Sequence, residues 1–181
     1  MPDRAQKEHV LLQRLGKKST PDTRDNLIVV GTQVLEQSLD IDFDFLITDL
    51  CPMDLLLQRL GRLHRHTRKR PVNVTQPCCA VLGANTETLE EGSRFVYGDW
   101  LLLQTKRLLP NSITLPQDIP MLVQDTYQEP QNTSELDEIS QQAWSDYCRH
   151  IESQKEKAKV YSIPKPSLSK RYANLNVISD L

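Results

Sequence analysis

Two short stretches carry side chains whose types and spacing suit work on phosphate groups. The first, GTQVLEQSLDID, begins at Gly31 and follows the apolar run LIVV directly. The second, QRLGRLHRH, begins at Gln58 and places an arginine at every third position. A guanidinium group grips phosphate through two parallel hydrogen bonds and stays charged at any working pH. Together the two stretches favour a site for a phosphate-bearing ligand.

Charge is distributed unevenly along the chain, although the net charge is only -2. An acidic block from Glu36 to Asp54 contains no base, and a basic block from Arg59 to Arg70 contains no acid. Neighbouring blocks of opposite sign indicate local charge pairing, a polyanionic ligand, or both. A solvated helix face without function is a third interpretation, because it accounts for most charge runs.

The elements that must position these stretches alternate as in an open parallel sheet. A helix is expected from Pro2 to Leu15, with Gly16 as its stop. Short apolar runs predict strands, the first of them buried on both faces, at residues 27–30, 45–47 and 78–82. Pro52 predicts the start of a helix that runs to Leu60. This order is typical of a doubly wound α/β domain, which binds its ligands at the ends of its strands.

The sequence becomes mostly helical after Gly83. Helices are expected over residues 93–109 and 116–127, followed by a polar linker near 128–137. Ser134 and Asp137 have the spacing of a capping box that opens an amphipathic helix to about Lys159. We therefore expect an α/β domain over residues 1–84 and a mostly helical accessory domain over 85–181.

The composition argues against several other classes of protein. The four cysteines have no C-x-x-C spacing, so neither a disulfide framework nor a metal site is expected. The first ten residues are charged where a secretory signal would be apolar. No run approaches the roughly 18 apolar residues of a membrane span. We expect a cytoplasmic protein with no membrane partner.

Taken in order, the two stretches resemble motifs V and VI of superfamily 2 helicases. More narrowly, they resemble the helicase-nuclease of type I CRISPR interference, whose motif V reads T-Q-x-x-E-Q-S-L-D-I-D and whose motif VI reads Q-R-x-G-R-x-x-R-H. FVYGDWLLLQTKRLL and LPQDIPMLVQDTY also look like that family's C-terminal domain. The resemblance spans residues 4–127. It implies the C-terminal portion of the enzyme, in which an N-terminally incomplete second RecA-like domain precedes the helical domain.

The resemblance implies a role for each residue that matches a nucleotide-facing position. Asp40 would hydrogen-bond the ribose of ATP. Arg62 and Arg65 would be the catalytic arginine fingers, which stabilise charge on the transferred γ-phosphoryl group. Gln58 and Arg59 belong to the same motif, which faces ATP across the cleft, and would tie the fingers to the opposite domain.

The resemblance also implies the activity and its partners. Gly31, Thr32 and Gln33 match positions that lie along the tracked single strand of DNA. The implied function is ATP-dependent translocation along single-stranded DNA in CRISPR interference, an antiviral defence. The implied cofactor is ATP with magnesium. The implied partners are single-stranded DNA, the first RecA-like domain of the parent enzyme and the CRISPR RNA-guided surveillance complex.

The motifs that would hold the ATP phosphates and magnesium do not occur in these 181 residues. The only Gly-Lys pair, Gly16 and Lys17, has Leu11 where a P-loop needs glycine and Lys18 where it needs a hydroxyl. The only Asp-Glu pair follows a polar linker instead of a strand, and no His-Asp pair could nucleate a nuclease site. We therefore expect the isolated chain to be inactive as a hydrolase. The alternative is a non-catalytic module that binds nucleic acid or protein.

Overall fold

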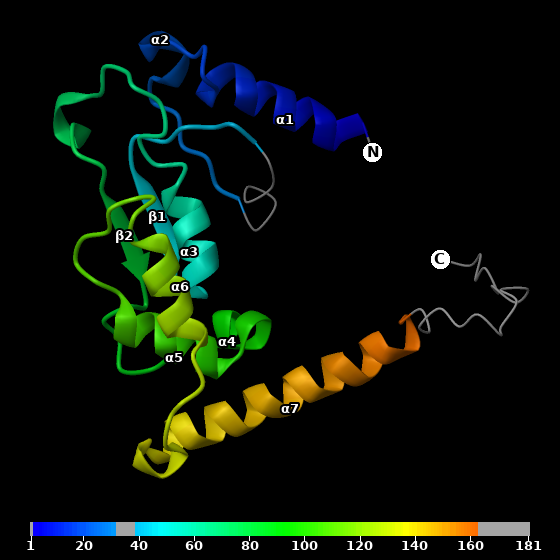
Figure 1. The fold of residues 1–181 in the computed structure, drawn as a ribbon. Coiled ribbons are helices and arrows are strands. Elements are labelled where there is room, and N and C mark those ends of the chain that lie inside the picture. The colour runs from blue at the N-terminus through cyan, green and yellow to red at the C-terminus, as the bar shows by residue number, and fades with distance from the viewer. Residues whose placement is uncertain (1, 32–38, 163–181) are drawn as a thin grey trace, which may run out of the picture. The chain divides into compact units, whose positions relative to one another are not determined.

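The computed structural model describes residues 2–31 and 39–162 of the chain (Figure 1). The chain forms two compact units, Met1–Tyr147 and Cys148–Leu181. The described elements, in order, are α1 (Pro2–Leu15), α2 (Pro21–Arg24), β1 (Leu46–Asp49), α3 (Met53–Leu60), the 3₁₀ turn η2 (Val72–Val74), β2 (Cys79–Leu82), α4 (Glu91–Tyr97), α5 (Asp99–Leu108), α6 (Ile119–Tyr127), the 3₁₀ turn η3 (Thr133–Glu135) and α7 (Glu138–Val160).

The first helix ends where the sequence predicts. The backbone N–H of Gly16 donates to the carbonyl of Leu12 at 2.9 Å. A Cβ atom at Gly16 would lie only 2.3 Å from that carbonyl oxygen, so the close approach requires glycine. The following segment contains the short helix α2. Its N-cap Thr20 and its third residue Thr23 form a reciprocal capping box.

Two of the three predicted strands are present and pair in parallel. In the described residues the sheet consists of β1 and β2, with Leu46 opposite Cys79 and Thr48 opposite Val81. The helix α3 connects them along the chain, which makes a β-α-β unit. Thr48 is buried, whereas its neighbour Ile47 is 60% exposed, so one face of the sheet is covered and the other is open. The mixed α/β class is therefore confirmed.

The strand predicted over residues 27–30 is wrong. These residues form no strand, and Ile28 and Val30 are 87% and 93% exposed. An apolar run becomes a buried strand only where a neighbouring strand accepts its hydrogen bonds. Among the described residues, β1 pairs with β2 alone and offers the run no such partner.

The main apolar core lies around α3. Pro52 is its N-cap residue, as expected, and Met53, Leu56 and Leu57 are buried on its inner face. They form one cluster with Leu122 of α6. Burying a side chain of this size stabilises the fold by roughly 1.5–3 kcal/mol. Because this core joins segments on both sides of residue 84, it holds the two halves of the first unit together; the domain boundary at that residue stays a prediction.

The single helix expected over residues 93–109 is two helices. Gly98 has a φ of 74°, a left-handed conformation that ends α4 and precedes α5. A side chain at Gly98 would be strained whatever the surrounding space. The periodic pattern of apolar residues does not reveal this break between the two helices. On α5, Trp100 is buried and its ring centroid lies 4.9 Å from that of Trp144 on α7.

The helix α7 is present as expected, but its cap is not the predicted one. Asp137 accepts hydrogen bonds from the backbone N–H and the hydroxyl of Ser140, at 2.9 and 2.8 Å. Ser134 instead belongs to the turn η3, where it donates to Asn132. Asp137 caps better here because its carboxylate also complements the positive end of the helix dipole. In the second unit, residues 148–160 continue as helix.

Candidate functional site

An extended stretch, residues 39–44 (the acidic segment), carries a carboxylate at every second position. The three residues are Asp40, Asp42 and Asp44. The backbone N–H of Asp42 donates to Leu15 at 3.0 Å, and that of Phe43 donates to the carbonyl of Arg62 at 2.8 Å. The segment is thereby held between the end of α1 and the loop after α3. Alternate side chains of an extended chain share one side, so the three carboxylates face the same way.

The loop after α3, residues 61–70 (the basic loop), runs beside the acidic segment. The backbone N–H of His64 donates to the carbonyl of Phe43 at 3.0 Å, and Leu63 forms a parallel bridge with Phe43. His64 has a φ of 50°, a region that residues other than glycine rarely occupy. Its Nε2 lies 3.0 Å from the carbonyl oxygen of Asp44. This turn directs the following arginines along the row of carboxylates.

Asp42 lies at the centre of the row and is fully buried, with 0% exposure. Its Oδ2 lies 2.6 Å from Arg68 Nε and 2.9 Å from Arg70 Nη2. Its Oδ1 accepts from Arg70 Nη2 at 2.9 Å and from the backbone N–H of Arg65 at 3.0 Å. The buried negative charge therefore faces two guanidinium groups and has N–H donors on both oxygens, as a buried charge requires.

Asp44 continues the same network toward α2. Its carboxylate oxygens lie 2.7 Å from Arg24 Nη2 and 2.7 Å from Arg70 Nη1. Burial raises the pKa of Asp44, but the hydrogen bonds and charges of Arg70 and Arg24 outweigh burial and hold the pKa below its usual 3.8. Burial likewise lowers the pKa of Arg70, and its bonds to Asp44 and Asp42 raise it by more. The local charge pairing expected from the sequence is confirmed here.

Asp40, at the outer end of the row, differs from Asp42 because solvent reaches it. Its Oδ1 lies 2.8 Å from Arg65 Nε and 3.2 Å from His66 Nε2. The side chains of Asp40 and Arg65 are 49% and 46% exposed. A ligand could therefore reach both groups without unfolding the segment.

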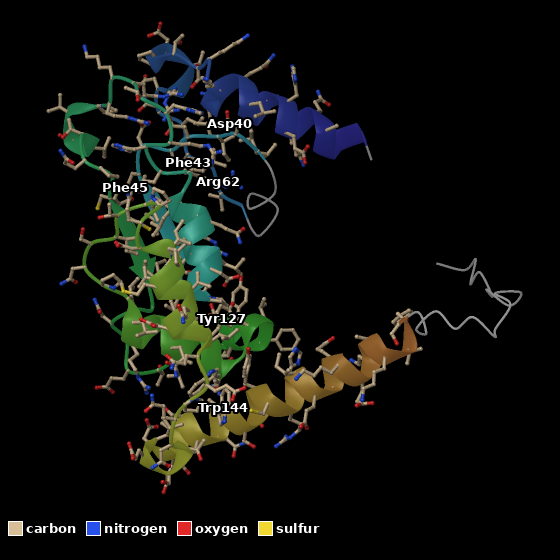
Figure 2. All side chains as sticks on the ribbon, viewed as in Figure 1. Asp40, Phe43, Phe45, Arg62, Tyr127 and Trp144 are labelled. Atoms are coloured by element: carbon tan, nitrogen blue, oxygen red, sulfur yellow. The ribbon has the colours of Figure 1, made fainter. Side chains whose placement is uncertain are left out.

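Arg62 is attached to the acidic segment at two points. Its Nη1 donates to the carbonyl of Leu39, and its own carbonyl accepts from Phe43. Figure 2 shows Asp40, Phe43 and Arg62 at one end of the first compact unit, away from Tyr127. Three predicted site residues, Asp40, Arg62 and Arg65, are thus brought together by the pairing of the acidic segment with the basic loop. We call these three residues the outer cluster.

The other two residues predicted to face the nucleotide lie on the last turn of α3. Arg59 extends toward β1 and α4, where its Nη1 donates to Thr48 Oγ1 at 2.6 Å and its Nη2 to the hydroxyl of Tyr97 at 3.3 Å. Gln58 is exposed. Arg59 therefore connects elements within this chain, a contact that its place in the motif did not reveal.

Of the three residues predicted to follow the DNA strand, the structure describes Gly31. Gly31 is exposed and belongs to no helix or strand. Thr32 and Gln33 lie outside the described residues. Within the described ranges, no group of three or more His, Cys, Asp and Glu side chains is placed to hold a metal ion. None of the helices described there combines the length and the apolar character that crossing a membrane requires.

The sequence motifs give no individual role to the residues that form the inner part of the network, which are Asp42, Asp44, Arg68 and Arg70. The signal available was the alternation DIDFD at residues 40–44, which places every carboxylate on one side of an extended chain. The carboxylates on that side that become buried, above all Asp42, must be neutralised. The nearby basic block supplies the arginines that do so.

Comparison with known proteins gives a consistent result. The protein-family model described as "CRISPR-associated nuclease/helicase Cas3, C-terminal" matches residues 1–68. The chain is 46% identical over 179 residues to the CRISPR-associated nuclease/helicase Cas3 of Streptococcus thermophilus, and the match covers 96% of this chain and 19% of the relative. It is 42% identical over 132 residues to the endonuclease/helicase Cas3 of Thermus thermophilus, covering 70% of this chain and 14% of that protein.

Solved structures agree with these relatives. T. fusca Cas3 with AMPPNP superposes with a TM-score of 0.76 at 30% identity, covering 90% of this chain and 19% of that one. A CRISPR RNA-guided surveillance complex in a pre-nicking state contains a chain that matches with a TM-score of 0.72 at 29% identity, covering 91% of this chain and 21% of that one. This chain therefore belongs to the family of the CRISPR-associated nuclease/helicase Cas3 and corresponds to the C-terminal region of its members.

Proposed function

We propose that this chain supplies motifs V and VI to an ATP-dependent helicase that translocates along single-stranded DNA in CRISPR interference, an antiviral defence in the cytoplasm. The observation that carries the proposal is the outer cluster of Asp40, Arg62 and Arg65, in which a solvent-accessible carboxylate and guanidinium group pair at 2.8 Å. Such a cluster offers an acceptor for hydroxyl groups beside donors for phosphate oxygens. The names of the relatives, nuclease/helicase Cas3, support the same class of activity.

The donor set of the outer cluster fits one side of a bound ATP molecule. Arg62 and Arg65 would bind phosphate oxygens, and Asp40 would accept a hydrogen bond from a ribose hydroxyl. When bound with magnesium, ATP supplies the γ-phosphoryl group that is transferred to water. The structurally similar T. fusca Cas3 has been solved with AMPPNP and with ATP, which supports nucleotide use by this family.

The arginines of the outer cluster are held in different ways, which suits two different tasks. Arg62 is fixed to the backbone of Leu39, so its guanidinium is already oriented before any ligand arrives. Arg65 pairs with a half-exposed carboxylate and can exchange Asp40 for a phosphate oxygen. A pre-oriented donor stabilises developing charge without reorganisation during the reaction, whereas an exchangeable donor can respond to nucleotide binding.

The remaining assignments concern DNA and the opposite domain. Gly31, Thr32 and Gln33 would contact the single strand through backbone and neutral side-chain groups. Gln58, which is exposed, and Arg59, which contacts Thr48, would complete the nucleotide-facing motif. The first RecA-like domain of the parent enzyme would provide the P-loop and the magnesium ligands that these 181 residues do not contain.

The CRISPR RNA-guided surveillance complex completes the set of proposed partners. A chain within a solved complex of that name matches this chain with a TM-score of 0.72. Recruitment by that complex would place single-stranded DNA within reach of the helicase.

The test is a lysine substitution at Arg62 in a full-length enzyme. This chain would replace the matching region of the Streptococcus thermophilus relative, to which it is 46% identical over 179 residues. Lysine keeps the charge but cannot reproduce the planar fork of arginine, so Arg62→Lys should lose most ATPase activity, toward the ~10³–10⁵-fold that a removed finger can cost. Arg94→Lys is the matched control, because Arg94 lies on α4, far along the chain from Arg62, and also pairs with a carboxylate, that of Asp99.

The loss should appear in kcat much more than in nucleotide affinity, because a finger acts mainly as the phosphoryl group transfers. Binding of single-stranded DNA without nucleotide should persist, since Arg62 is not assigned to the strand. A normal kcat with weaker, more salt-sensitive DNA binding would instead favour a non-catalytic nucleic-acid-binding module.

A further inference from the structure

The geometry points to Asp42 as a positioning residue that fixes the phosphate-facing arginines Arg62 and Arg65 relative to the acidic segment. This inference rests on the proposed function, and it assigns a role to a residue outside the outer cluster. Asp42 is fully buried, so it would touch neither nucleotide nor DNA. Its effect on the reaction would pass through the backbone of the basic loop.

The contact that carries this role is a hydrogen bond to the main chain of the basic loop. Asp42 Oδ1 accepts from the backbone N–H of Arg65 at 3.0 Å. The next residue of the acidic segment, Phe43, donates to the carbonyl of Arg62 at 2.8 Å. Consecutive residues of one segment therefore fix the backbone of both arginines. Between these two arginines, His64 adopts a φ of 50°, which residues other than glycine rarely do.

The side chain of Asp42 cannot shift without disturbing this arrangement. Arg68 and Arg70 bring guanidinium groups to 2.6 and 2.9 Å of its Oδ2, and Arg70 also donates to Oδ1. Arg70 donates to both carboxylate oxygens and its own side chain is nearly buried, so Arg70 can hold the carboxylate in place from the inside without Arg68. The amide of Arg65 thus meets an acceptor whose position is set by the core. Beyond that amide, the Arg65 side chain extends outward to Asp40 at 2.8 Å.

Asp44 provides an internal comparison. It is also a carboxylate held by two arginines, Arg24 and Arg70, each at 2.7 Å. Its carboxylate accepts hydrogen bonds from those two guanidinium groups and, among the described residues, from no main-chain N–H of the basic loop. Substitution at Asp44 should therefore weaken the fold without moving the arginines of the outer cluster.

The decisive variant is Asp42→Asn in the full-length chimeric enzyme, with Asp44→Asn as the matched control. Asparagine keeps the shape of aspartate but offers only one acceptor oxygen. Whichever way it is oriented, its NH₂ group must face either the Arg65 amide or the arginines that surround the other oxygen. We expect kcat to fall on the order of 10²-fold, the effect of a misplacement of about 1 Å, with little change in KM for ATP. Asp44→Asn should keep a kcat close to that of the parent.

A third variant separates positioning from loss of stability. Arg68→Met removes the guanidinium 2.6 Å from Asp42 but leaves the bond between Asp42 and the Arg65 amide. It should lower the melting temperature at least as much as Asp42→Asn and still keep kcat. In the 181-residue chain, amide hydrogen exchange at Arg65 should accelerate in Asp42→Asn and remain slow in Arg68→Met.

The outcomes distinguish this inference from the function on which it rests. If Arg62→Lys abolishes turnover but Asp42→Asn behaves like Asp44→Asn, only the positioning role is wrong. If kcat falls in Arg68→Met as far as in Asp42→Asn, the effect is loss of stability and the positioning role is again overturned. If Arg62→Lys has normal kcat, the proposed function itself fails.

Discussion

Replacing Arg70 by methionine should strongly destabilise the 181-residue chain. The Arg70 side chain is only 6% exposed and contacts both Asp42 and Asp44. Removing one partner of a buried ion pair costs about 3–5 kcal/mol. Here three arginines face two carboxylates, so Arg24 and Arg68 still balance the charge after the change. We therefore expect the lower end of the range, about 3 kcal/mol, a large part of the ~5–15 kcal/mol that stabilises a typical domain.

The assay is urea unfolding followed by tryptophan fluorescence, because Trp100 is buried and lies in the same compact unit as Arg70. Arg94→Met is the matched control: Arg94 also pairs with a carboxylate, that of Asp99 at 2.8 Å, but it is about half exposed. Exposed pairs contribute little, so the control should unfold at nearly the parental urea concentration. Equal midpoints for Arg70→Met and Arg94→Met would refute the reasoning.

The pH dependence of the stability of the fold provides a second test of the same network. The folded-state pKa of Asp44 lies below its usual 3.8, because the hydrogen bonds and charges of Arg70 and Arg24 outweigh the effect of burial. A carboxyl group with a lowered pKa stabilises the fold above about pH 3.8 and loses that contribution as the pH falls through the folded-state value. Parental stability should therefore decline in that acidic range. Arg70→Met, which loses one of the two stabilising charges, should decline less steeply.

Three further outcomes are expected of the 181-residue chain. Purified alone, it should hydrolyse no ATP above background, and robust turnover that disappears in Arg62→Lys would contradict this. Gly98→Ala should lower the free energy of unfolding by about 1–3 kcal/mol, since Gly98 has a φ of 74° and a ψ of 155°, a backbone region almost reserved for glycine. Gly61→Ala, at a helical φ of -63°, is its control and should lose none. The chain should self-associate through exposed apolar residues such as Ile28 and Val30, and a concentration-independent monomer in sedimentation would count against that.

Local signals in the sequence located the elements around the site. Gly16 and Pro52 mark a helix end and a helix start because a close backbone approach and a fixed φ act within a few residues. The apolar runs at β1 and β2 predicted strands because each has a paired neighbour in the fold. The motif resemblance named Asp40, Arg62 and Arg65 as candidates without showing that they lie together, whereas the charge pairing was predicted from the two blocks of opposite sign.

What could not be predicted depends on contacts between distant segments. The apolar run at residues 27–30 has strand character, but its state depends on whether another strand lies beside it. The turn at His64 and the break at Gly98 depend on a single backbone angle that the periodic pattern does not encode. The burial of Asp42 depends on where Arg68 and Arg70 meet it, and a sequence shows those charges without showing which ones face inward.

Because Arg68 and Arg70 are directed inward, they should contribute little to the salt dependence with which this part of the chain binds a polyanion. Single-stranded DNA releases condensed counterions when protein cations neutralise its phosphates, and the affinity falls with salt by a slope of about 0.7 per phosphate neutralised. Arg68 and Arg70 already face the carboxylates of Asp42 and Asp44 and are largely shielded from solvent. They would release no counterions, whereas Lys69, which is exposed between them, could. The salt dependence of the proposed strand binding should therefore reflect surface cations alone, and it should be shallower than the number of basic residues in the sequence suggests.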